Sequence, residues 1–315
     1  MQEPRIAILA TGGTIAGLSK DNLSLNYKAG VLSIDSLIKS LPKINAKIST
    51  YQISNIDSCD MDDEIQIKLA KKINELFEKD IDGIVVTHGS DTLEESAYFI
   101  QLSVKSNKPV IFTASMRPFF SLSSDGPKNL YNAIILATKS KGVLISINDK
   151  IFSPRVLSKT HTLNLNAFSS PNELGYIVDN DIFFYEKNKK APFDIDKITT
   201  LPKVDILYSY SNDGNAISAK ALFENGTKGL VIAGSGAGSI HKNLKNVLKE
   251  LIKKGLIIVV STRVAFGSVI LSKEDIKLGF ISALDLNPQK ARILLILALS
   301  KTKNIQKIQK YFLKY

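Results

Sequence analysis

Short apolar runs alternate with amphipathic helical segments along the chain, and this pattern limits the fold more than any other feature. Four runs rich in Val and Ile are typical of parallel strands buried on both faces: 6–10, 83–87, 109–114 and 142–147. Apolar residues recur between them with helical spacing, over 62–79, 91–106 and 125–140. Strands that alternate with helices predict a doubly wound α/β sheet.

The same alternation resumes after a polar segment. Residues 176–186 predict a short hairpin with Asn-Asp at its turn. The stretch that follows, 187–202, is polar, contains two prolines and has no strand or helix period. We expect the linker there, at 191–202, between an N-terminal domain over 1–190 and a C-terminal domain over 203–315. The predicted elements of the second domain are strands 204–210, 229–233 and 256–260, helices 215–225 and 239–254, and two helices from 287. The fold class is therefore α/β, with two doubly wound three-layer domains, the larger one N-terminal.

Charge and composition narrow the range of partners. The formal net charge is +11, but the lysines are spread along helical stretches such as 241–255, and no arginine-rich tract is present. We interpret them as solvated helix faces and predict no nucleic-acid partner. Three histidines far apart and a single cysteine, Cys59, give no metal-ligand spacing and no internal disulfide. No apolar run approaches the roughly 18 residues of a membrane span, so no membrane association is predicted.

Polar residues follow three of the predicted strands directly. The first strand leads into "TGGTIAG" at 11–17, the next into "THGSDTLEE" at 87–95, and a third into "ASMRP" at 114–118. In open α/β sheets, ligands bind beyond the carboxyl ends of the strands. The Thr14 and Ser90 hydroxyls, the Asp91 carboxylate, and the N–H groups of Gly13 and Gly89 could converge there. That is the layout of a nucleophile beside an oxyanion pocket.

Each motif taken alone also has a plain structural interpretation. "TGGTIAG" lacks both the dinucleotide-binding glycine spacing and the lysine of a phosphate loop, so it could be a turn with a capping threonine. Ser90 or Asp91 could cap the next helix, with Glu94 as a capping-box partner. His88 could serve as a base for Ser90, although packing or capping is more typical of a histidine placed there. "GSGAGSIHK" at 234–242 could bind an anion at a helix start.

Two of these motifs together resemble a known family. "ILATGGTIAG" and "VVTHGSDTLEESAYF" closely resemble the two signatures of bacterial-type L-asparaginases. The likeness extends over nearly the whole chain, through "ISNIDSCDM" (53–61), "ASMRP" (114–118), "SDGPKNLYNA" (124–133), "LSKTHT" (157–162) and "LNPQKARILLILAL" (286–299). The chain resembles the exported, type II kind. The resemblance implies a larger flavodoxin-like and a smaller Rossmann-like domain. It also implies hydrolysis of asparagine, and in some members glutamine, to the acid and ammonia without a cofactor.

The resemblance also implies catalytic roles. Thr14 matches the family's nucleophile. Tyr27, on a loop expected to close over substrate, matches the tyrosine that hydrogen-bonds to that hydroxyl. Ser90, Lys159 and Asp91 match a Thr–Lys–Asp triad. A bare hydroxyl is a poor nucleophile, so a positioned base and a stabilised oxyanion are what such a site needs.

Substrate binding is implied for a second group of residues. Ser58 matches the residue that holds the substrate α-carboxylate, and Asp91 matches the one that pairs with its ammonium. Such a grip on both charged groups selects a free amino acid. The backbone carbonyl of Ser115 matches the acceptor of the leaving amide. The remaining positions implied to contact substrate are Cys59, Gly89 and Ser239.

The chain departs from the family pattern at several of these positions. Ser90 stands where a threonine is usual, which keeps the hydroxyl but frees its rotamer. Cys59 stands where glutamine commonly contacts the ammonium. Ser239 replaces the asparagine that reaches the neighbouring subunit's site. The segment 268–275 is shorter than in the family, and the glutamate that the partner subunit supplies has no secure match.

The family implies a homotetramer with active sites completed across an intimate dimer, acting on L-asparagine. Its exported type implies a periplasmic location, whereas the chain as given has no signal peptide and, if full length, would be cytoplasmic. Two other functions remain possible on sequence grounds. One is an amidotransferase subunit, which usually carries an added domain. The other is a non-catalytic amino-acid-binding protein on the same scaffold.

Overall fold

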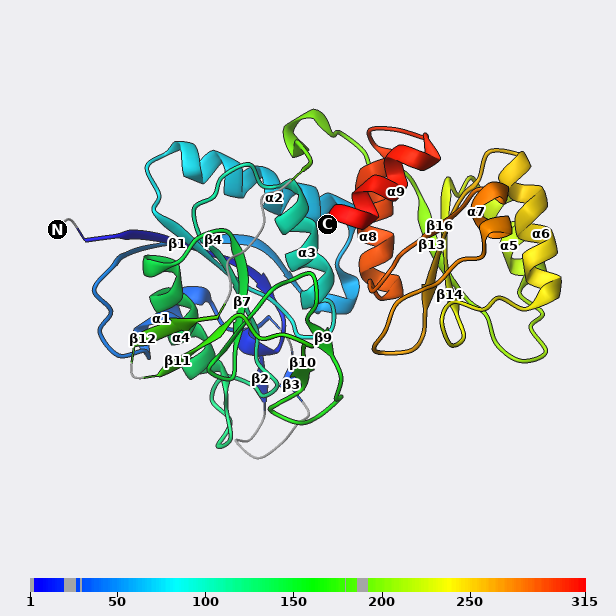
Figure 1. Ribbon diagram of the computed structural model, residues 1–315. Coiled ribbons are helices and arrows are strands. Elements are labelled where there is room, and N and C mark those ends of the chain that lie inside the picture. Colours follow the sequence, from blue (N-terminus) through cyan, green and yellow to red (C-terminus); the bar gives the residue numbers. More distant parts are fainter. Residues whose placement is uncertain (1–2, 20–26, 29, 179, 186–191) are drawn as a thin grey trace. The chain divides into compact units, whose positions relative to one another are not determined.

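The computed structural model describes residues 3–19, 27–28, 30–178, 180–185 and 192–315 (Figure 1). The chain divides into two compact units, Met1–Lys197 and Ile198–Tyr315. This division falls inside the stretch 191–202 that the sequence predicts to be a linker. Among the described residues, no helix has the length and apolar character needed to cross a membrane.

The first unit is built on an eight-stranded sheet of order β12-β11-β8-β7-β6-β5-β1-β4. Its strands are β1 (Arg5–Gly12), β4 (Lys47–Ile56), β5 (Gly83–Thr87), β6 (Val110–Thr113), β7 (Val143–Ile147), β8 (Lys150–Phe152), β11 (Gly175–Val178) and β12 (Asp181–Phe184). The strands β4, β1, β5, β6 and β7 are parallel. Numbered along the chain, their order is 2-1-3-4-5, the flavodoxin-like order. The other three strands add antiparallel pairings at one edge.

Helices cover both faces of this sheet. They are α1 (Ile34–Lys39), α2 (Asp63–Glu78), α3 (Leu93–Ser103) and α4 (Gly126–Lys139), with short 3-10 turns η1 (Thr14–Ala16), η2 (Ser58–Asp60) and η3 (Ile195–Lys197). Buried side chains of α1 and α4 pack against Ile6 and Ile8 of β1 in one core. The helices α2 and α3 pack together and contact the sheet on its other face (Figure 1). The unit is therefore a three-layer α/β domain, as predicted.

Two further pairs of short strands lie outside the main sheet. β2 (Leu18–Ser19) pairs with β3 (Tyr27–Lys28), and β9 (Ser158–Lys159) pairs with β10 (Phe168–Ser169), both antiparallel. The first pair forms the base of the loop that the sequence predicts to be a lid; residues 20–26 and 29 of that loop lie outside the described residues.

The second unit contains a parallel four-stranded sheet of order β13-β14-β15-β16. Its elements are β13 (Val204–Tyr208), β14 (Gly229–Gly234), β15 (Ile257–Thr262), β16 (Phe280–Ser282), α5 (Ala216–Glu224), α6 (Lys242–Lys253), α7 (Lys273–Leu278), α8 (Pro288–Leu299) and α9 (Ile305–Lys314). Apolar side chains of α5 and α6 form one core with the sheet, and α8 contacts the sheet and α9 (Figure 1). The predicted strands and helices are all present, with ends that differ by a few residues.

The structure corrects one prediction at the start of α3. That helix begins at Leu93 with Thr92 as its N-cap, and the Thr92 side chain makes no capping hydrogen bond. Neither Ser90 nor Asp91 is the capping residue, so the capping interpretation of "GSDTLEE" is wrong. Both side chains are left for contacts outside the helix. The hairpin predicted over 176–186 is confirmed by the antiparallel pair β11 and β12.

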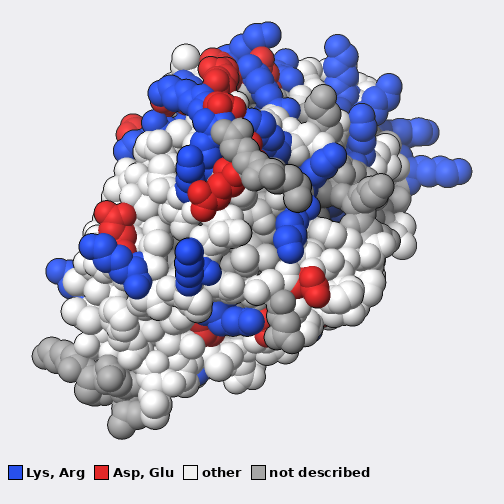
Figure 2. All heavy atoms as spheres, turned by 90° about the vertical axis from the view of Figure 1, so that its left-hand side faces the viewer, with Lys and Arg blue, Asp and Glu red and all other residues white. Residues whose placement is uncertain are grey.

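The distribution of charge agrees with solvated helix faces. On the face drawn in Figure 2, lysine and arginine side chains are most frequent toward the top and right of the view, and aspartate and glutamate side chains lie among them. One example is α2, where Glu75 forms ion pairs with both Lys72 and Lys79. Such exposed pairs contribute little to stability. On α2, part of the positive charge is therefore balanced by a carboxylate of the same helix.

Candidate active site

Three loops meet at the carboxyl edge of the first unit's sheet. Thr14 opens the turn η1 directly after β1, Ser58 opens η2 after β4, and Ser90 and Asp91 lie between β5 and α3. Because β1 lies between β4 and β5 in the sheet, the three loops are neighbours. This is the place where the strand order reverses, at which open α/β sheets bind their ligands.

Glycines allow these loops to pack backbone against backbone. Gly13 has a positive φ of 80°, and a Cβ atom there would overlap Gly89 Cα. A Cβ atom on Gly89 would in turn lie 2.6 Å from Ser58 Oγ. Side chains at either position would push the loops apart. The two glycines thus hold the Thr14 turn, the Ser90 loop and Ser58 close together.

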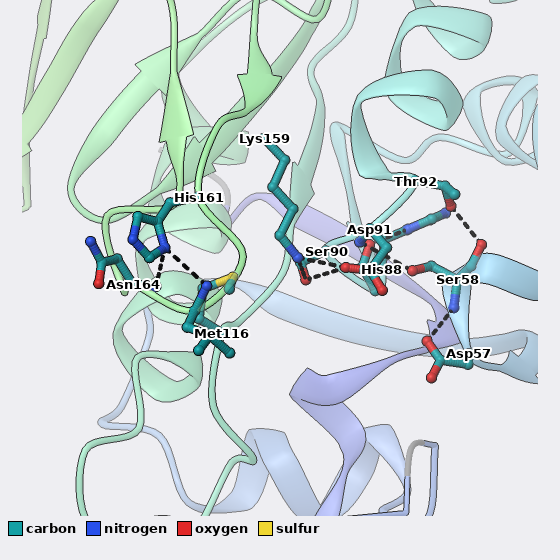
Figure 3. A network of polar contacts seen from close by, with 12 residues as sticks. Asp57, Ser58, His88, Ser90, Asp91, Thr92, Met116, Lys159, His161 and Asn164 are labelled. Carbon is teal, nitrogen blue, oxygen red and sulfur yellow. Dashed lines mark hydrogen bonds and ion pairs between the residues drawn. The ribbon is translucent and has the colours of Figure 1, made fainter. Parts of the chain in front are cut away.

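A lysine ties the Ser90 loop to a distant part of the chain (Figure 3). Lys159 Nζ, projecting from β9, lies 2.9 Å from Ser90 Oγ and 2.5 Å from Asp91 Oδ1. The lysine side chain is only 17% exposed, whereas that of Asp91 is 59% exposed. The structure therefore brings the hydroxyl, the ammonium and the carboxylate of the implied triad together. It leaves the Asp91 carboxylate open to a ligand.

Ser58 is fixed beside Asp91 by hydrogen bonds at three of its atoms (Figure 3). Its Oγ accepts a hydrogen bond from the Asp91 N–H at 3.2 Å, and its carbonyl accepts one from Thr92 Oγ1 at 2.7 Å. Its own N–H donates to Asp57 Oδ1 at 2.7 Å. A hydroxyl and a carboxylate held side by side can bind the carboxylate and the ammonium of one amino acid.

His88 is a packed residue and not a base for Ser90. Its side chain is fully buried, and Nδ1 donates to the Gly89 carbonyl at 2.8 Å. Burial lowers the pKa of His88 to about 4, so the ring is neutral near pH 7. Its ring centroid lies 6.1 Å from that of Phe112. Ser90 Oγ contacts Lys159 and Asp91 instead.

Ser115 lies in a loop after β6. Two residues brace this loop: Asp125, the N-cap of α4, and Asn129 of α4. Ser115 is 2% exposed. The Asp125 carboxylate accepts hydrogen bonds from the Met116 and Arg117 N–H groups, and Asn129 Nδ2 donates to both Asp125 Oδ2 and the Ala114 carbonyl. The segment 124–133 is part of the family resemblance, but the sequence predicts no role for Asp125 or Asn129. Their i, i+4 spacing at a predicted helix start is the signal that could have identified them.

Cys59 follows Ser58 in η2 and is exposed. Partial desolvation, together with the carboxylates of Asp57 and Asp60, raises the pKa of the Cys59 thiol. The thiol is therefore neutral near pH 7. It offers a short, weakly polar side chain next to the residues that can hold an amino acid.

Two further predicted site residues, Tyr27 and Ser239, are described apart from this group. Tyr27 lies on β3, paired with Ser19 of β2, and its side chain is outside the described residues. Ser239 belongs to the second unit, where it is exposed at a tight turn closed by its N–H bond to the Ser235 carbonyl at 2.7 Å. It also lines a cavity of about 310 Å³ within that unit. Over the described residues, no group of three or more His, Cys, Asp or Glu side chains could hold a metal ion.

Ser90, Lys159 and Asp91 lie together at the edge of a flavodoxin-like sheet where the strand order reverses. Such a group of side chains is typical of an α/β enzyme that hydrolyses a small polar molecule. Two family models match the chain: "Asparaginase, N-terminal" over residues 5–190 and "Glutaminase/Asparaginase C-terminal domain" over 203–312. The chain belongs to the asparaginase family.

Individual relatives resemble the chain over almost its full length. L-asparaginase 2 of Bacillus subtilis is 45% identical, with 99% of this chain and 87% of the relative covered. A probable periplasmic L-asparaginase of Haemophilus influenzae is 44% identical, with 98% and 92% covered. The crystal structure of a probable cytoplasmic L-asparaginase from Campylobacter jejuni is 60% identical and superposes with a TM-score of 0.97, covering 99% of this chain and all of that one.

Proposed function

We propose that the chain hydrolyses the side-chain amide of free L-asparagine to L-aspartate and ammonia, with Thr14 as the nucleophile. The contact of Lys159 with both Ser90 and Asp91 carries this proposal. A lysine amine in contact with a hydroxyl and a carboxylate, next to the loop that bears Thr14, supports a role in proton transfer. Membership of the asparaginase family supports the substrate.

The geometry suggests how substrate is held and cleaved. Asp91 pairs with the substrate ammonium and Ser58 Oγ holds its α-carboxylate, which directs the side-chain amide toward Thr14. The Thr14 oxygen attacks the amide carbon while its hydroxyl proton passes to the Ser90–Lys159 pair, and backbone N–H donors stabilise the oxyanion. As the C–N bond breaks, the same pair passes a proton on to the leaving nitrogen, which departs as ammonia. Water then hydrolyses the aspartyl ester, and aspartate leaves.

The remaining implied contacts complete this scheme. Tyr27 hydrogen-bonds to the Thr14 hydroxyl, and the Ser115 carbonyl accepts a hydrogen bond from the departing amide. Gly89 contributes its N–H. No metal or cofactor takes part in the scheme. Because Cys59 cannot extend a polar arm to the ammonium, the grip on the substrate rests more heavily on Asp91, and any glutaminase activity is expected to be minor.

Ammonia release tests this function. The wild-type protein is expected to release ammonia from L-asparagine and to release it more slowly from L-glutamine. The Thr14→Ala variant is expected to bind asparagine, as followed by calorimetry, without releasing ammonia. If the wild-type protein bound asparagine and left the amide intact, the chain would be an amino-acid-binding protein on this scaffold.

We also propose that four copies assemble and that Ser239 of one copy contributes to a neighbouring copy's site. The family resemblance supports this assembly, and the second unit exposes large apolar side chains, among them Tyr208, Ile217 and Phe266, that such an interface would cover. Light scattering is expected to give a mass four times the 34.6 kDa of the chain. A monomeric mass with full activity would contradict the shared site.

A periplasmic location is the third part of the proposal. It rests on the resemblance to the exported type and on the Haemophilus influenzae relative whose name gives that compartment. The relative from Campylobacter jejuni is named cytoplasmic. Release of the activity by osmotic shock of the source cells would support the periplasm, and retention with cytoplasmic markers would contradict it.

A further inference from the structure

The peptide unit that joins Ser115 to Met116 is held by a carboxylate. The Met116 N–H lies 3.0 Å from Asp125 Oδ1 and 2.9 Å from Oδ2, and the next N–H, of Arg117, lies 3.1 Å from Oδ1. A carboxylate that accepts several backbone N–H bonds forms strong, charge-assisted contacts. The loop after β6 is thus attached at two consecutive amides to one side chain.

This attachment fixes the direction of the Ser115 carbonyl. The carbonyl of Ser115 and the N–H of Met116 belong to the same planar trans peptide unit, so they point in opposite directions. Because the N–H is aimed at Asp125, the carbonyl oxygen is aimed away from it. Rotation of this peptide plane would break the bond to Asp125. The orientation of the carbonyl is therefore set by a residue that does not touch it.

Asp125 is itself braced from behind. Asn129 Nδ2 donates to Asp125 Oδ2 at 3.1 Å and to the Ala114 carbonyl at 2.9 Å. Its Oδ1 accepts from the Asn148 N–H at 2.9 Å, and the Asn129 side chain is 2% exposed. Through Asn129, the Asp125 carboxylate is connected to the turn after β7 and is held in a fixed position.

The charge on Asp125 also acts through the peptide unit. A carboxylate that accepts from an amide N–H polarises the amide and makes its carbonyl oxygen a stronger acceptor, since hydrogen bonds in a chain reinforce one another. The pKa of Asp125 is raised by burial, although the Met116 and Arg117 N–H groups and the Arg117 side chain act against that rise. These N–H groups and the guanidinium of Arg117 thus favour the charged carboxylate against the cost of its burial.

We propose that Asp125 is a positioning residue for amide substrates, which orients and polarises the Ser115 carbonyl so that this oxygen accepts a hydrogen bond from the departing nitrogen. The inference rests on the role given to Ser115 under the proposed function. It extends that role to a residue outside the substrate pocket. Asp125 thereby helps the site to distinguish the nitrogen leaving group of an amide from the oxygen leaving group of an ester.

Comparing an amide with an ester tests this role. The β-methyl ester of L-aspartate carries the same charged groups as asparagine, but its leaving oxygen has no N–H to donate to the Ser115 carbonyl. In Asp125→Asn, the negative charge is lost and only one oxygen is left to accept the Met116 and Arg117 N–H bonds, so the clamp is weakened without change of size. The kcat/KM for asparagine is expected to fall by about tenfold to a hundredfold. The kcat/KM for the ester is expected to change by less than about threefold, because it never used this bond.

A matched variant separates positioning from general destabilisation. Thr113 lies on β6, and its buried hydroxyl donates to the Ser146 carbonyl at 2.8 Å, away from the substrate. Thr113→Val removes that bond and is expected to leave the amide-to-ester ratio of kcat/KM at the wild-type value. Asp125→Glu keeps the charge and is expected to recover part of the ratio lost in Asp125→Asn.

Nuclear magnetic resonance provides a second readout that does not depend on turnover. The chain has three methionines, so selective ¹⁵N-methionine labelling gives few backbone signals. The Met116 N–H proton is expected downfield in the wild type and shifted upfield in Asp125→Asn.

Two results would overturn the proposal: an equal loss on the amide and the ester in Asp125→Asn, or an unchanged Met116 signal. Failure of the proposed function would look different, because Thr14→Ala would then still release ammonia or the wild type would release none.

Discussion

At the scale of single residues, Lys159 is the group on which the candidate site depends most. Its Nζ contacts both Ser90 Oγ and Asp91 Oδ1, and it is largely buried. In Lys159→Met the proton-transfer group is lost while the volume of the side chain is retained. We expect kcat for asparagine to fall by about a hundredfold or more.

A second lysine provides the control for that prediction. Lys150 pairs with Glu173 at 2.6 Å and is more exposed. Because exposed ion pairs contribute little, Lys150→Met is expected to keep kcat within about twofold of wild type. Equal losses in the two variants would show that the effect of Lys159→Met comes from destabilisation and not from chemistry.

Cys59 is expected to limit the affinity for substrate. The exposed thiol is short and neutral, and its sulfur is a weak acceptor, so it can neither accept a strong hydrogen bond from the substrate ammonium nor reach as far as a longer amide. In Cys59→Gln, an added polar contact to the substrate ammonium is expected to lower the KM for asparagine by roughly threefold to tenfold. Cys59→Ser, which is equally short, is the control and is expected to leave KM near the wild-type value. Steady-state kinetics in which Cys59→Gln raised KM would contradict this account.

At the scale of secondary structure, the helix α2 begins with a well-formed cap. Asp62 Oδ1 accepts the Ile65 N–H at 2.7 Å. Asp62→Ala is expected to lower the free energy of unfolding by about 1 kcal/mol. Asp62→Asn, which can still cap, is expected to lower it by less, and kcat is expected to be unchanged in both. Urea denaturation measures the free energy of unfolding of the wild type and the two variants. An Asp62→Ala protein as stable as the wild type would show that the cap does not stabilise the fold.

The sequence predicts the central parallel strands and the hairpin of β11 and β12, but it misses the edge strand β4. β1, β5, β6 and β7 are mostly apolar and contain Val or Ile, because both of their faces are buried. β4 is an edge strand in which Ile53 is the only fully buried residue of ten, so its apolar pattern is too weak to mark it. The short elements β8, β16 and α7 are likewise not predicted, because they contain few residues on which a period could be read.

The candidate site was predictable in its residues but not in its contacts. The strand–loop–helix pattern indicates which polar residues follow β1 and β5. The resemblance, in turn, supplies Lys159, which lies 68 residues beyond Asp91. The overlap that a side chain on Gly13 would make with Gly89, and the bonds of Asp125 to the Ser115 loop, depend on the distance between separate strands. No local pattern in the sequence encodes those distances.

At the scale of the whole molecule, His88 makes stability depend on pH. Its pKa is about 4 in the folded protein and has a reference value of 6.5, so the unfolded chain binds the proton more readily between these values. The contribution of His88 is present above about pH 6.5 and is lost as the pH falls toward 4. From pH 7 to pH 5 this loss is about 2 kcal/mol.

Comparison with a variant isolates the contribution of His88. Asp125 has the opposite effect, since the raised pKa of a carboxyl group favours the folded state as the pH falls. His88→Gln removes the pH-dependent contribution of His88 to the free energy of unfolding and leaves that of Asp125. This variant is expected to lose less stability between pH 7 and pH 5 than the wild type. His161→Gln, at an exposed position, is expected to keep the wild-type slope. Parallel pH profiles of the wild type and His88→Gln would contradict the burial argument.

The central claim is that Thr14 carries the aspartyl group during turnover. The most direct measurement is an acid quench of the working enzyme with L-asparagine, followed by peptide mass spectrometry. We predict that the mass of one aspartyl group appears on the peptide containing Thr14 and is absent from Thr14→Ala. An aspartyl group on Ser90, with Thr14 unmodified, would contradict the account and assign the attack to the other hydroxyl.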